Sequence, residues 1–421
     1  MATKPGTRAR ASVSAFTQEL FGRLPRADQR RWAHAYMEGL LSTPGKKSVR
    51  RLAASVSDSC TAPQSLHQFI NASPWAWEPV RAELTRWVQR HTAPRAWTIG
   101  LAVVPKRGDR SCGVHRRFVP QAGRTLNCQV GVGAFLSTDT EDVPVDWRLL
   151  LPDPWSNDPA LRRRARIPES TAPRSAEAQT LDLVESLPTG GQLAEVPVVA
   201  DLEGYADTGE IVRALSAQGR HFVVAVPAAL PVLAVPVRHA RTTALAVPAA
   251  RMNLTASTGP TAPAAPAASA APADLTVRQV LTRREAAPPH PVTVRTRQGE
   301  DRTAHVLTGL VRLPEPRTGP SRPSPATEHR PALRVFAEID PNTRRPGRTW
   351  ITSLTNRPPG ELLELAALHA GTADTVRQLE DDFGLLAFEG RSYPGWHHHM
   401  TLVSAAFAYS SLTTTGRGGT R

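Results

Sequence analysis

The order of strand-like and helical segments between residues 98 and 227 constrains the fold more than any other feature of the sequence. Three apolar runs of strand character come first, and two further strands then alternate with two amphipathic helices. In chain order these are the strands Thr98–Val104, Leu126–Thr138 and Val145–Leu151, the helix Ala176–Ser186, the strand ending at Asp201, the helix Gly209–Gly219 and the strand His221–Pro227. Such an order predicts an α/β fold with a mixed sheet.

The rest of the chain predicts helices on either side of this sheet and an interruption within it. Apolar residues recur at helical spacing before residue 92 and after residue 357. Between them, the Pro/Ala-rich segment Thr255–Asp274 is a low-complexity linker flanked by short strand-like runs. The expected organisation is a basic disordered tail (1–15), an all-helical N-terminal DNA-binding domain (16–92), the first part of the core (93–227), an insertion (228–356), C-terminal helices that complete the core (357–412) and a disordered tail (413–421).

The charge balance points to a polyanionic partner. The 421 residues include 51 Lys and Arg against 37 Asp and Glu, a net charge of +14 at pH 7. Most of the excess is arginine, whose planar guanidinium suits phosphate, so nucleic acid is favoured over a basic but functionally idle surface. Three widely spaced cysteines exclude a disulfide framework and a zinc finger. Because no membrane-length apolar run and no export signal is visible, we expect a cytoplasmic, nucleoid-associated protein with no membrane contact.

Two clusters of cations are candidate DNA contacts. The first opens a predicted helix, where positive charge opposes the helix dipole and is expected to face an anion. It consists of Lys46, Lys47, Arg50 and Arg51. The second is either a solvated face or a set of phosphate contacts. It consists of Arg162, Arg163, Arg164 and Arg166. Trp75 and Trp77 are either core residues or wedges for bases, and the frequent burial of tryptophan favours the core.

Several stretches, in a consistent order, together resemble the DDE transposases of bacterial insertion sequences. They are FEGRSYPGWHHHMTLVSAAFAY from Phe388, NCQVGVGAFLS followed by VDWRLLLPDPW, SLHQFINASPWAWEPVR, and VVADLEGYAD followed by FVVAVP. The resemblance covers residues 16–412 apart from the Pro/Ala-rich segment. It implies an RNase H-like nuclease core with a β-rich insertion between the fifth strand and the C-terminal helices. It also implies double-stranded DNA at insertion-sequence ends as the partner, a homodimer on that DNA, and Mg²⁺ or Mn²⁺ as the family's cofactor.

In this resemblance two Asp and one Glu hold the metal ions, and this sequence retains one of the three. Alignment on Pro105-Lys106 places Gly100 and Leu101 where the first Asp belongs, and counting back from the FEGR motif places Ala373 at the Glu. The second Asp corresponds to Asp201, which read alone is equally a helix cap or turn residue. Mg²⁺ prefers carboxylate oxygens, so of these positions only Asp201 is expected to contact a metal ion. One carboxylate is not expected to hold the family's metal ions.

The resemblance adds further candidate DNA contacts, and neighbouring acids do not restore the site. The added contacts are Lys106, Arg107, Arg391, His397 and His398. Three consecutive helical histidines point about 100° apart, so His397–His399 are not expected to bind one ion. For the same reason Asp374 does not replace Ala373.

Three functions therefore stay open at this point. The first is a transposase-like DNA-binding protein whose nuclease site has decayed. The second is an active metal-dependent transposase that uses shifted ligands with Asp201. The third is a DNA-binding repressor derived from a transposase.

Overall fold

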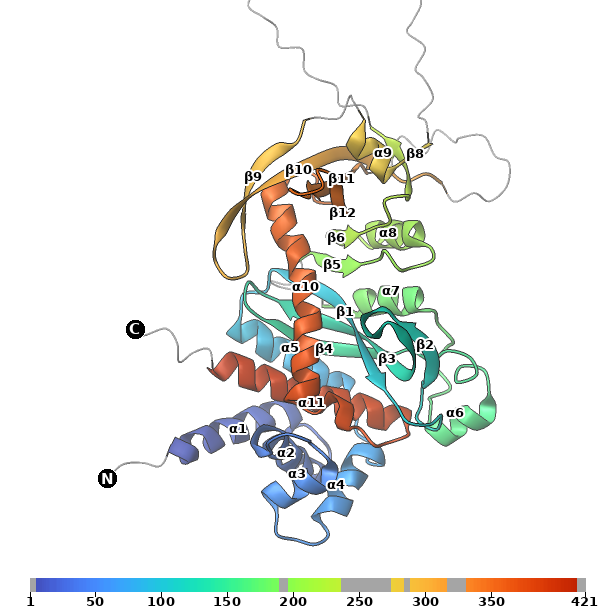
Figure 1. The fold of residues 1–421 in the computed structure, drawn as a ribbon. Coiled ribbons are helices and arrows are strands. Elements are labelled where there is room, and N and C mark those ends of the chain that lie inside the picture. The colour runs from blue at the N-terminus through green and yellow to red at the C-terminus, as the bar shows by residue number, and fades with distance from the viewer. Residues whose placement is uncertain (1–4, 189–195, 236–273, 284–287, 316–330, 415–421) are drawn as a thin grey trace, which may run out of the picture.

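The computed structural model describes residues 5–188, 196–235, 274–283, 288–315 and 331–414. These residues form one twelve-stranded sheet, with a layer of helices at one end of the molecule and further helices on the faces of the sheet (Figure 1). Among the described helices, none has both the length and the apolar character that a bilayer crossing requires.

Five strands build the core in the expected order. β1 (Ala96–Pro105), β3 (Arg124–Ser137) and β4 (Asp142–Leu149) are antiparallel to one another in turn. β5 (Val198–Asp201) and β6 (Phe222–Ala225) continue the sheet parallel to β1, which gives the order β4-β3-β1-β5-β6. This mixed sheet confirms the predicted α/β fold class.

Helices and one unpredicted strand complete this part of the chain. α7 (Ala176–Ser186) and α8 (Thr208–Ala217) lie where the sequence predicts them, and α6 (Pro159–Ala165) precedes them. β2 (His115–Val119) was not predicted, and it pairs with the first residues of β3. Its sequence, HRRFV, is too short and too basic to show a strand pattern.

The insertion extends the same sheet beyond β6. It comprises β7 (Pro231–Ala234), β8 (Asp274–Thr276), α9 (Val277–Thr282), β9 (His290–Arg295), β10 (Asp301–Arg312), β11 (Leu333–Ile339) and β12 (Pro346–Thr352). The strand order onward from β6 is β12-β11-β10-β7-β8, with β9 paired to β10. Where short strands were expected, Val277–Thr282 is a helix that opens with a capping box between Thr276 and Gln279. The Pro/Ala-rich run up to residue 273 lies outside the described residues.

Two long helices close the fold. α10 (Pro359–Asp381) passes from the insertion strands across β1 toward α11 (Tyr393–Thr414) (Figure 1). α10 continues through Gly371, although glycine is a poor helix former. A Cβ at Gly371 would collide with the ion pair between Arg297 and Asp142 that lies against the helix, so glycine is required there by space.

The N-terminal helices pack directly on α11. They are α1 (Pro5–Phe21), α2 (Ala27–Ser42), α3 (Val49–Val56), α4 (Ala62–Asn71) and α5 (Glu78–His91). Their buried side chains join those of α11 and the sheet in a single hydrophobic cluster, so the helical segment at 16–92 has no separate core. The predicted disordered tail at 1–15 is wrong from Pro5 onward, because α1 begins there. Likewise α11 extends to Thr414, and residues 415–421 lie outside the described chain.

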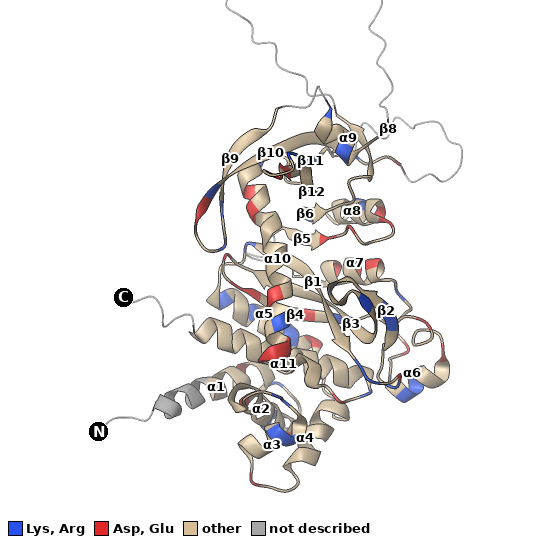
Figure 2. Cartoon of the chain, viewed as in Figure 1, with Lys and Arg blue, Asp and Glu red and all other residues tan. Residues whose placement is uncertain are grey.

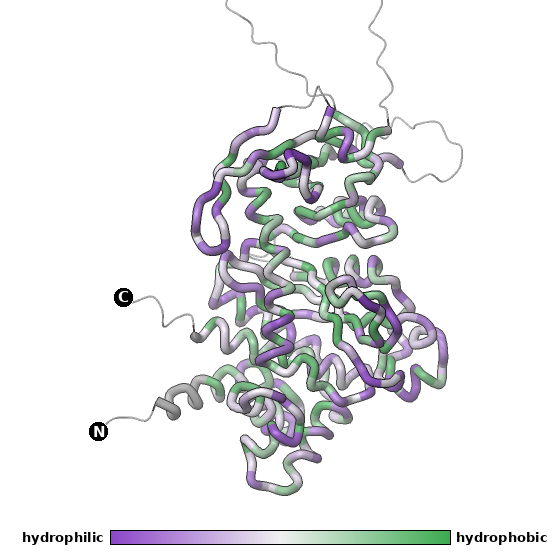
Figure 3. The backbone as a smooth tube through the Cα atoms, viewed as in Figure 1, coloured by the Kyte–Doolittle hydropathy of each residue, from purple (hydrophilic) through white to green (hydrophobic). Residues whose placement is uncertain are grey.

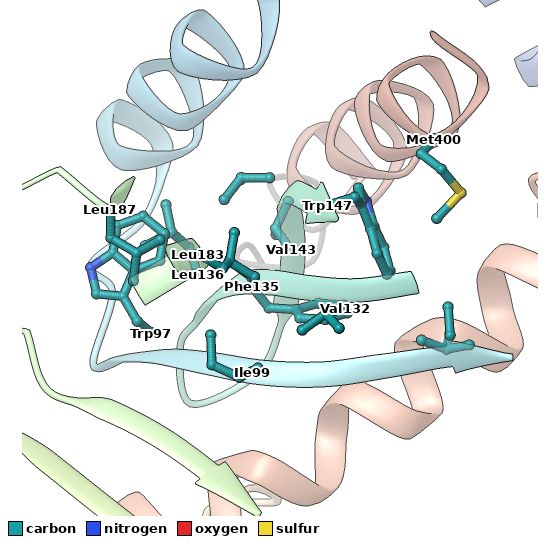
Figure 4. Close-up of a cluster of buried hydrophobic side chains, with 14 of the residues drawn as sticks. Trp97, Ile99, Val132, Phe135, Leu136, Val143, Trp147, Leu183, Leu187 and Met400 are labelled. Carbon is teal, nitrogen blue, oxygen red and sulfur yellow. The ribbon is translucent and has the colours of Figure 1, made fainter. Parts of the chain in front are cut away.

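Buried side chains of β1, β3 and β4 form a large part of the hydrophobic core (Figure 4). Trp97 and Trp147 are fully buried, and the Trp147 ring lies edge-on to Phe135 with 5.5 Å between ring centroids. A Cβ at Gly133 would lie 2.6 Å from Trp147 Cζ3, so the glycine makes room for the indole. The indole Nε1 donates to Ser404 Oγ at 2.8 Å, which ties β4 to α11.

Candidate metal site and nucleic-acid interface

The predicted metal site falls where the middle of β1 lies beside the end of β5. The two strands are parallel and paired from Trp97↔Val198 to Ile99↔Ala200, so Gly100 comes next to Asp201. Register neighbours in a parallel pair point to the same face. Gly100 and Asp201 therefore share a face, and Leu101 points to the other one. Of the two positions expected for the first Asp, Gly100 is therefore the one on the same face as Asp201.

α10 covers the face of the sheet that Gly100 and Asp201 share. A Cβ at Gly100 would lie 2.9 Å from Cβ of Thr372, so helix and strand are in close contact at this point. His369, one turn earlier, lies near Asp201, Arg348 and the Ile99 carbonyl. Burial lowers the His369 pKa, and the Asp201 carboxylate opposes that shift. Ala373 is exposed one turn beyond His369 on the same side of the helix.

Asp201 is bonded through both carboxylate oxygens. Its Oδ2 lies 2.9 Å from Nη2 of Arg348, and the same guanidinium nitrogen lies 3.2 Å from Oε2 of Glu203. Oδ1 accepts a hydrogen bond from the Glu203 backbone amide at 3.0 Å, which closes a turn after β5. Asp201 is thus a turn residue and an ion-pair partner. Arg348 belongs to β12 of the insertion and was not singled out from the sequence, because nothing local to it indicates this contact.

The residues at this junction do not fit a pair of divalent ions. Two such ions require several carboxylates converging on one point, and Gly100 and Ala373 supply none. Asp374 is exposed and paired with Arg377 on the outer side of α10. Within the described parts of the chain, no group of three or more His, Cys, Asp or Glu residues is placed to hold a metal ion.

A second group of candidate residues comes together where the β1–β2 loop meets the FEGR motif. Lys106 Nζ donates to the Phe388 carbonyl at 2.6 Å and lies over the Phe388 ring. Burial lowers the Lys106 pKa to about 8. The backbone amide of Cys112 donates to the Arg391 carbonyl at 3.1 Å, so the β1–β2 loop is bonded to the FEGR motif at two points. Arg107 and Arg391 are exposed on this surface.

The arginines of α6 divide into structural and exposed groups. Arg162 donates to the carbonyls of Ser156, Pro168 and Thr171 at 2.7–3.1 Å, so its guanidinium holds the surrounding loop and is not free for phosphate. Arg163 and Arg164 are exposed. Arg166 donates to Ser392 Oγ at 2.9 Å, which places α6 beside the start of α11 and next to Arg391. Figure 2 shows the cations on α6 and on β2.

In the first cluster, Lys47 is wrong as a DNA contact. Its side chain is buried, and Nζ donates to the carbonyls of Leu40 and Thr43 at the end of α2. A lysine ammonium there satisfies carbonyls that the helix leaves without partners. Lys46, Arg50 and Arg51 are exposed, and Arg51 donates to the Pro44 carbonyl at 2.9 Å. α3 begins at Val49, so Lys46 and Lys47 precede the helix.

His397 and His398 are also wrong as DNA contacts, because both are buried. The His398 ring stacks on Trp75, with 3.9 Å between centroids, and its two nitrogens lie 2.8 Å from the carbonyl oxygens of Ile70 and Trp75. His397 stacks on Trp77. Burial lowers the His398 pKa to about 4 and the His397 pKa well below its ordinary value. The tryptophans and histidines therefore form one core layer between the N-terminal helices and α11.

Comparison with known proteins identifies the family of this chain. A family profile described as "DDE superfamily endonuclease" matches residues 19–289, more than half of the chain. One similar solved structure is the "piggyBac transposase synaptic complex with hairpin DNA", at a TM-score of 0.41 and 10% identity, covering 98% of this chain and 75% of that chain. A likeness this distant adds nothing to the family assignment. No curated protein matches the sequence. The family match alone shows that the chain belongs to the DDE superfamily endonucleases.

Proposed function

We propose that this protein is a transposase-derived DNA-binding protein whose nuclease site no longer holds its metal ions. The observation that carries the proposal is the junction of β1, β5 and α10. There, Asp201 is the one acid left of the expected three, and Arg348 is paired with it at 2.9 Å. The positive charge of Arg348 opposes the binding of a divalent cation at this point, and Gly100 and Ala373 supply no carboxylate to hold one.

Exposed arginines support DNA as the partner. Arg107, Arg163, Arg164 and Arg391 lie on connected segments, since the β1–β2 loop is bonded to Arg391 and α6 is bonded to Ser392. In the described structure none of these four side chains makes an ion pair with an acid. Each phosphate that they neutralise releases counterions, which gives sequence-independent affinity. In this proposal the protein binds the double-stranded ends of its insertion sequence as a homodimer, in the nucleoid.

A mobility-shift titration with the full chain tests the proposal. The probes are DNA from both flanks of its gene and an unrelated duplex, each with Mg²⁺ and with EDTA. We expect a shift that does not depend on metal. Asp201→Ala should leave the affinity unchanged or slightly tighter, because it removes one negative charge near the phosphates. Arg377→Ala is the control for charge, since Arg377 is exposed but paired within α10.

Three results would decide between the open alternatives. Strong weakening by Asp201→Ala, or a shift that requires Mg²⁺, would contradict the proposal and favour an active transposase. Preference for the element's own ends without cleavage would favour a repressor. Failure to bind either duplex would overturn DNA binding altogether.

A further inference from the structure

The β2–β3 hairpin projects beyond the end of β1. β1 ends at Pro105, opposite Cys128, while β3 continues back to Arg124 with β2 as its partner. The inner face of this ribbon is fixed, since Val119 and Cys128 belong to a small buried cluster against which Leu126 and Ala176 of α7 pack. The outer face has no such role.

Phe118 lies on that outer face. It is 58% exposed, the highest exposure among the large hydrophobic side chains in the described chain. Burial alternates along β2, so Phe118 and Arg116 point outward while Arg117 and Val119 point inward. Across the ribbon Phe118 is paired with Thr125, which is also exposed. The ring therefore contributes nothing to the cluster beneath it.

Positive charge surrounds this ring. The segment Lys106–Arg124 holds six Lys and Arg and one acid, Asp109. Arg107, Arg110 and Arg116 are exposed, and Arg116 shares the outer face with Phe118. Asn127 Nδ2 donates to the Gly108 carbonyl at 2.5 Å, which holds the arginine-bearing loop against the ribbon. Figure 3 shows the backbone of this part of the chain as mostly hydrophilic, and the sequence places Phe118 directly after Arg116 and Arg117.

We propose that the β2–β3 hairpin binds DNA that carries an unpaired base, with Phe118 stacked on that base and the surrounding arginines on the adjacent phosphates. A phenyl ring has no donor or acceptor, so what it offers a nucleic acid is its flat face. Aromatic rings on strands stack on bases without regard to sequence, and basic side chains beside them follow the backbone. Fully paired DNA keeps its base faces stacked within the duplex, so the occupant is a strand end or flap. This inference rests on the proposed function.

The test compares a blunt duplex with the same duplex carrying a single-stranded tail, using fluorescence anisotropy and the full chain. We expect wild type to prefer the tailed probe. Phe118→Ala should weaken binding to the tailed probe about tenfold and leave the blunt probe within about twofold, whereas Phe118→Trp should retain the preference. The paired change Arg110→Ala/Arg116→Ala should weaken both probes and lower the salt dependence. Leu386→Ala is the matched control, because Leu386 is 46% exposed elsewhere on the surface.

A second readout reports stacking directly. With 2-aminopurine in the tail, wild type and Phe118→Trp should change the fluorescence of the base on binding, and Phe118→Ala should not. The inference is overturned if wild type shows no preference for the tailed probe, or if Phe118→Ala behaves as Leu386→Ala does. It is also overturned if Phe118→Ala alters self-association rather than DNA binding. Wild type that binds neither probe would overturn the proposed function as well.

Discussion

Nη2 of Arg348 lies 2.9 Å from Oδ2 of Asp201, so a residue of the insertion neutralises the one acid retained from the expected metal site. Arg348 comes from β12 and Asp201 from the end of β5, with β6 between them in the sheet. The insertion therefore reaches the junction of β1, β5 and α10 through the Arg348 side chain. Both partners are partly exposed, which limits how much the pair stabilises the fold.

Replacing Asp201 by Asn should cost little stability. The amide oxygen can still accept the Glu203 amide, while the ion pair with Arg348 is lost; a partly exposed pair contributes about 1 kcal/mol or less. Urea unfolding of Asp201→Asn and Arg348→Ala measures this, with Arg377→Ala as the surface control. A loss above about 3 kcal/mol for Asp201→Asn would show that the pair has a larger structural role than its exposure allows.

Arg81 should matter far more than any surface arginine. It is buried on α5 and donates to Asp146 Oδ1 at 2.9 Å, to the Trp147 and His397 carbonyls and to Thr401 Oγ1. Removing one partner of a buried pair typically costs about 3–5 kcal/mol. We expect Arg81→Ala to lower the free energy of unfolding by about that amount. The matched change Arg148→Ala removes a more exposed partner of the same Asp146, and an equal effect of the two would contradict this account.

The histidine layer should make stability depend on pH. The pKa is about 4 for His398 and His399, chiefly because of burial, and an unfolded histidine titrates near about 6.5. Between these values the unfolded chain binds more protons than the folded one. Stability is therefore fully present above pH ~6.5 and falls as the pH drops toward 4.

Three other groups act on this layer. Arg81 and Arg166 lower the His398 pKa further, and Lys106 lowers that of His399. Urea unfolding at neutral and mildly acidic pH should show the loss, and His399→Gln should reduce its size. Stability that does not change over this range would show that the rings are charged or solvated in the fold.

The register of β1 against β5 decides how a metal site would have to be rebuilt. Leu101→Asp with Ala373→Glu should bind no more Mn²⁺ than wild type, because residue 101 points away from Asp201. Gly100→Asp with Ala373→Glu and Thr372→Gly places the acids on one face and removes the Thr372 Cβ, which a Cβ at residue 100 would meet at 2.9 Å. Mn²⁺ binding followed by electron paramagnetic resonance separates the two designs. Stronger binding by the Leu101 design would show that the register is wrong.

The sheet and most helices were predictable because their signals are local. Apolar periodicity found β1, β3, β5 and β6, the bounds of α7, and several strands of the insertion, but not β7 or β8. β2 was missed because two arginines interrupt its pattern. Only the first part of α1 was missed, because its first residues are rich in Arg, Thr and Ser. The histidines of α11 stack on Trp75 and Trp77, which belong to a distant segment. Their burial was therefore not visible from their own neighbours in the sequence.

The candidate site was predictable only in part, for a related reason. That Gly100, Leu101 and Ala373 carry no acid could be read from the sequence, but that Gly100 shares a face with Asp201 required the strand register. Lys47 and His398 are polar residues that bond to backbone carbonyls of other segments, so their type alone indicated exposure. Arg348 reaches Asp201 from a distant part of the chain, which no local pattern reports.

Cleavage of DNA from both flanks of the gene tests the central claim most directly. Purified full-length protein is incubated with labelled DNA in Mg²⁺ or Mn²⁺, with EDTA as the control, and the strands are resolved on a denaturing gel beside a mobility shift of the same probe. The account predicts intact strands and a clear shift. Discrete, EDTA-sensitive cuts at the element ends that disappear in Asp201→Ala would contradict it and show that the nuclease is active.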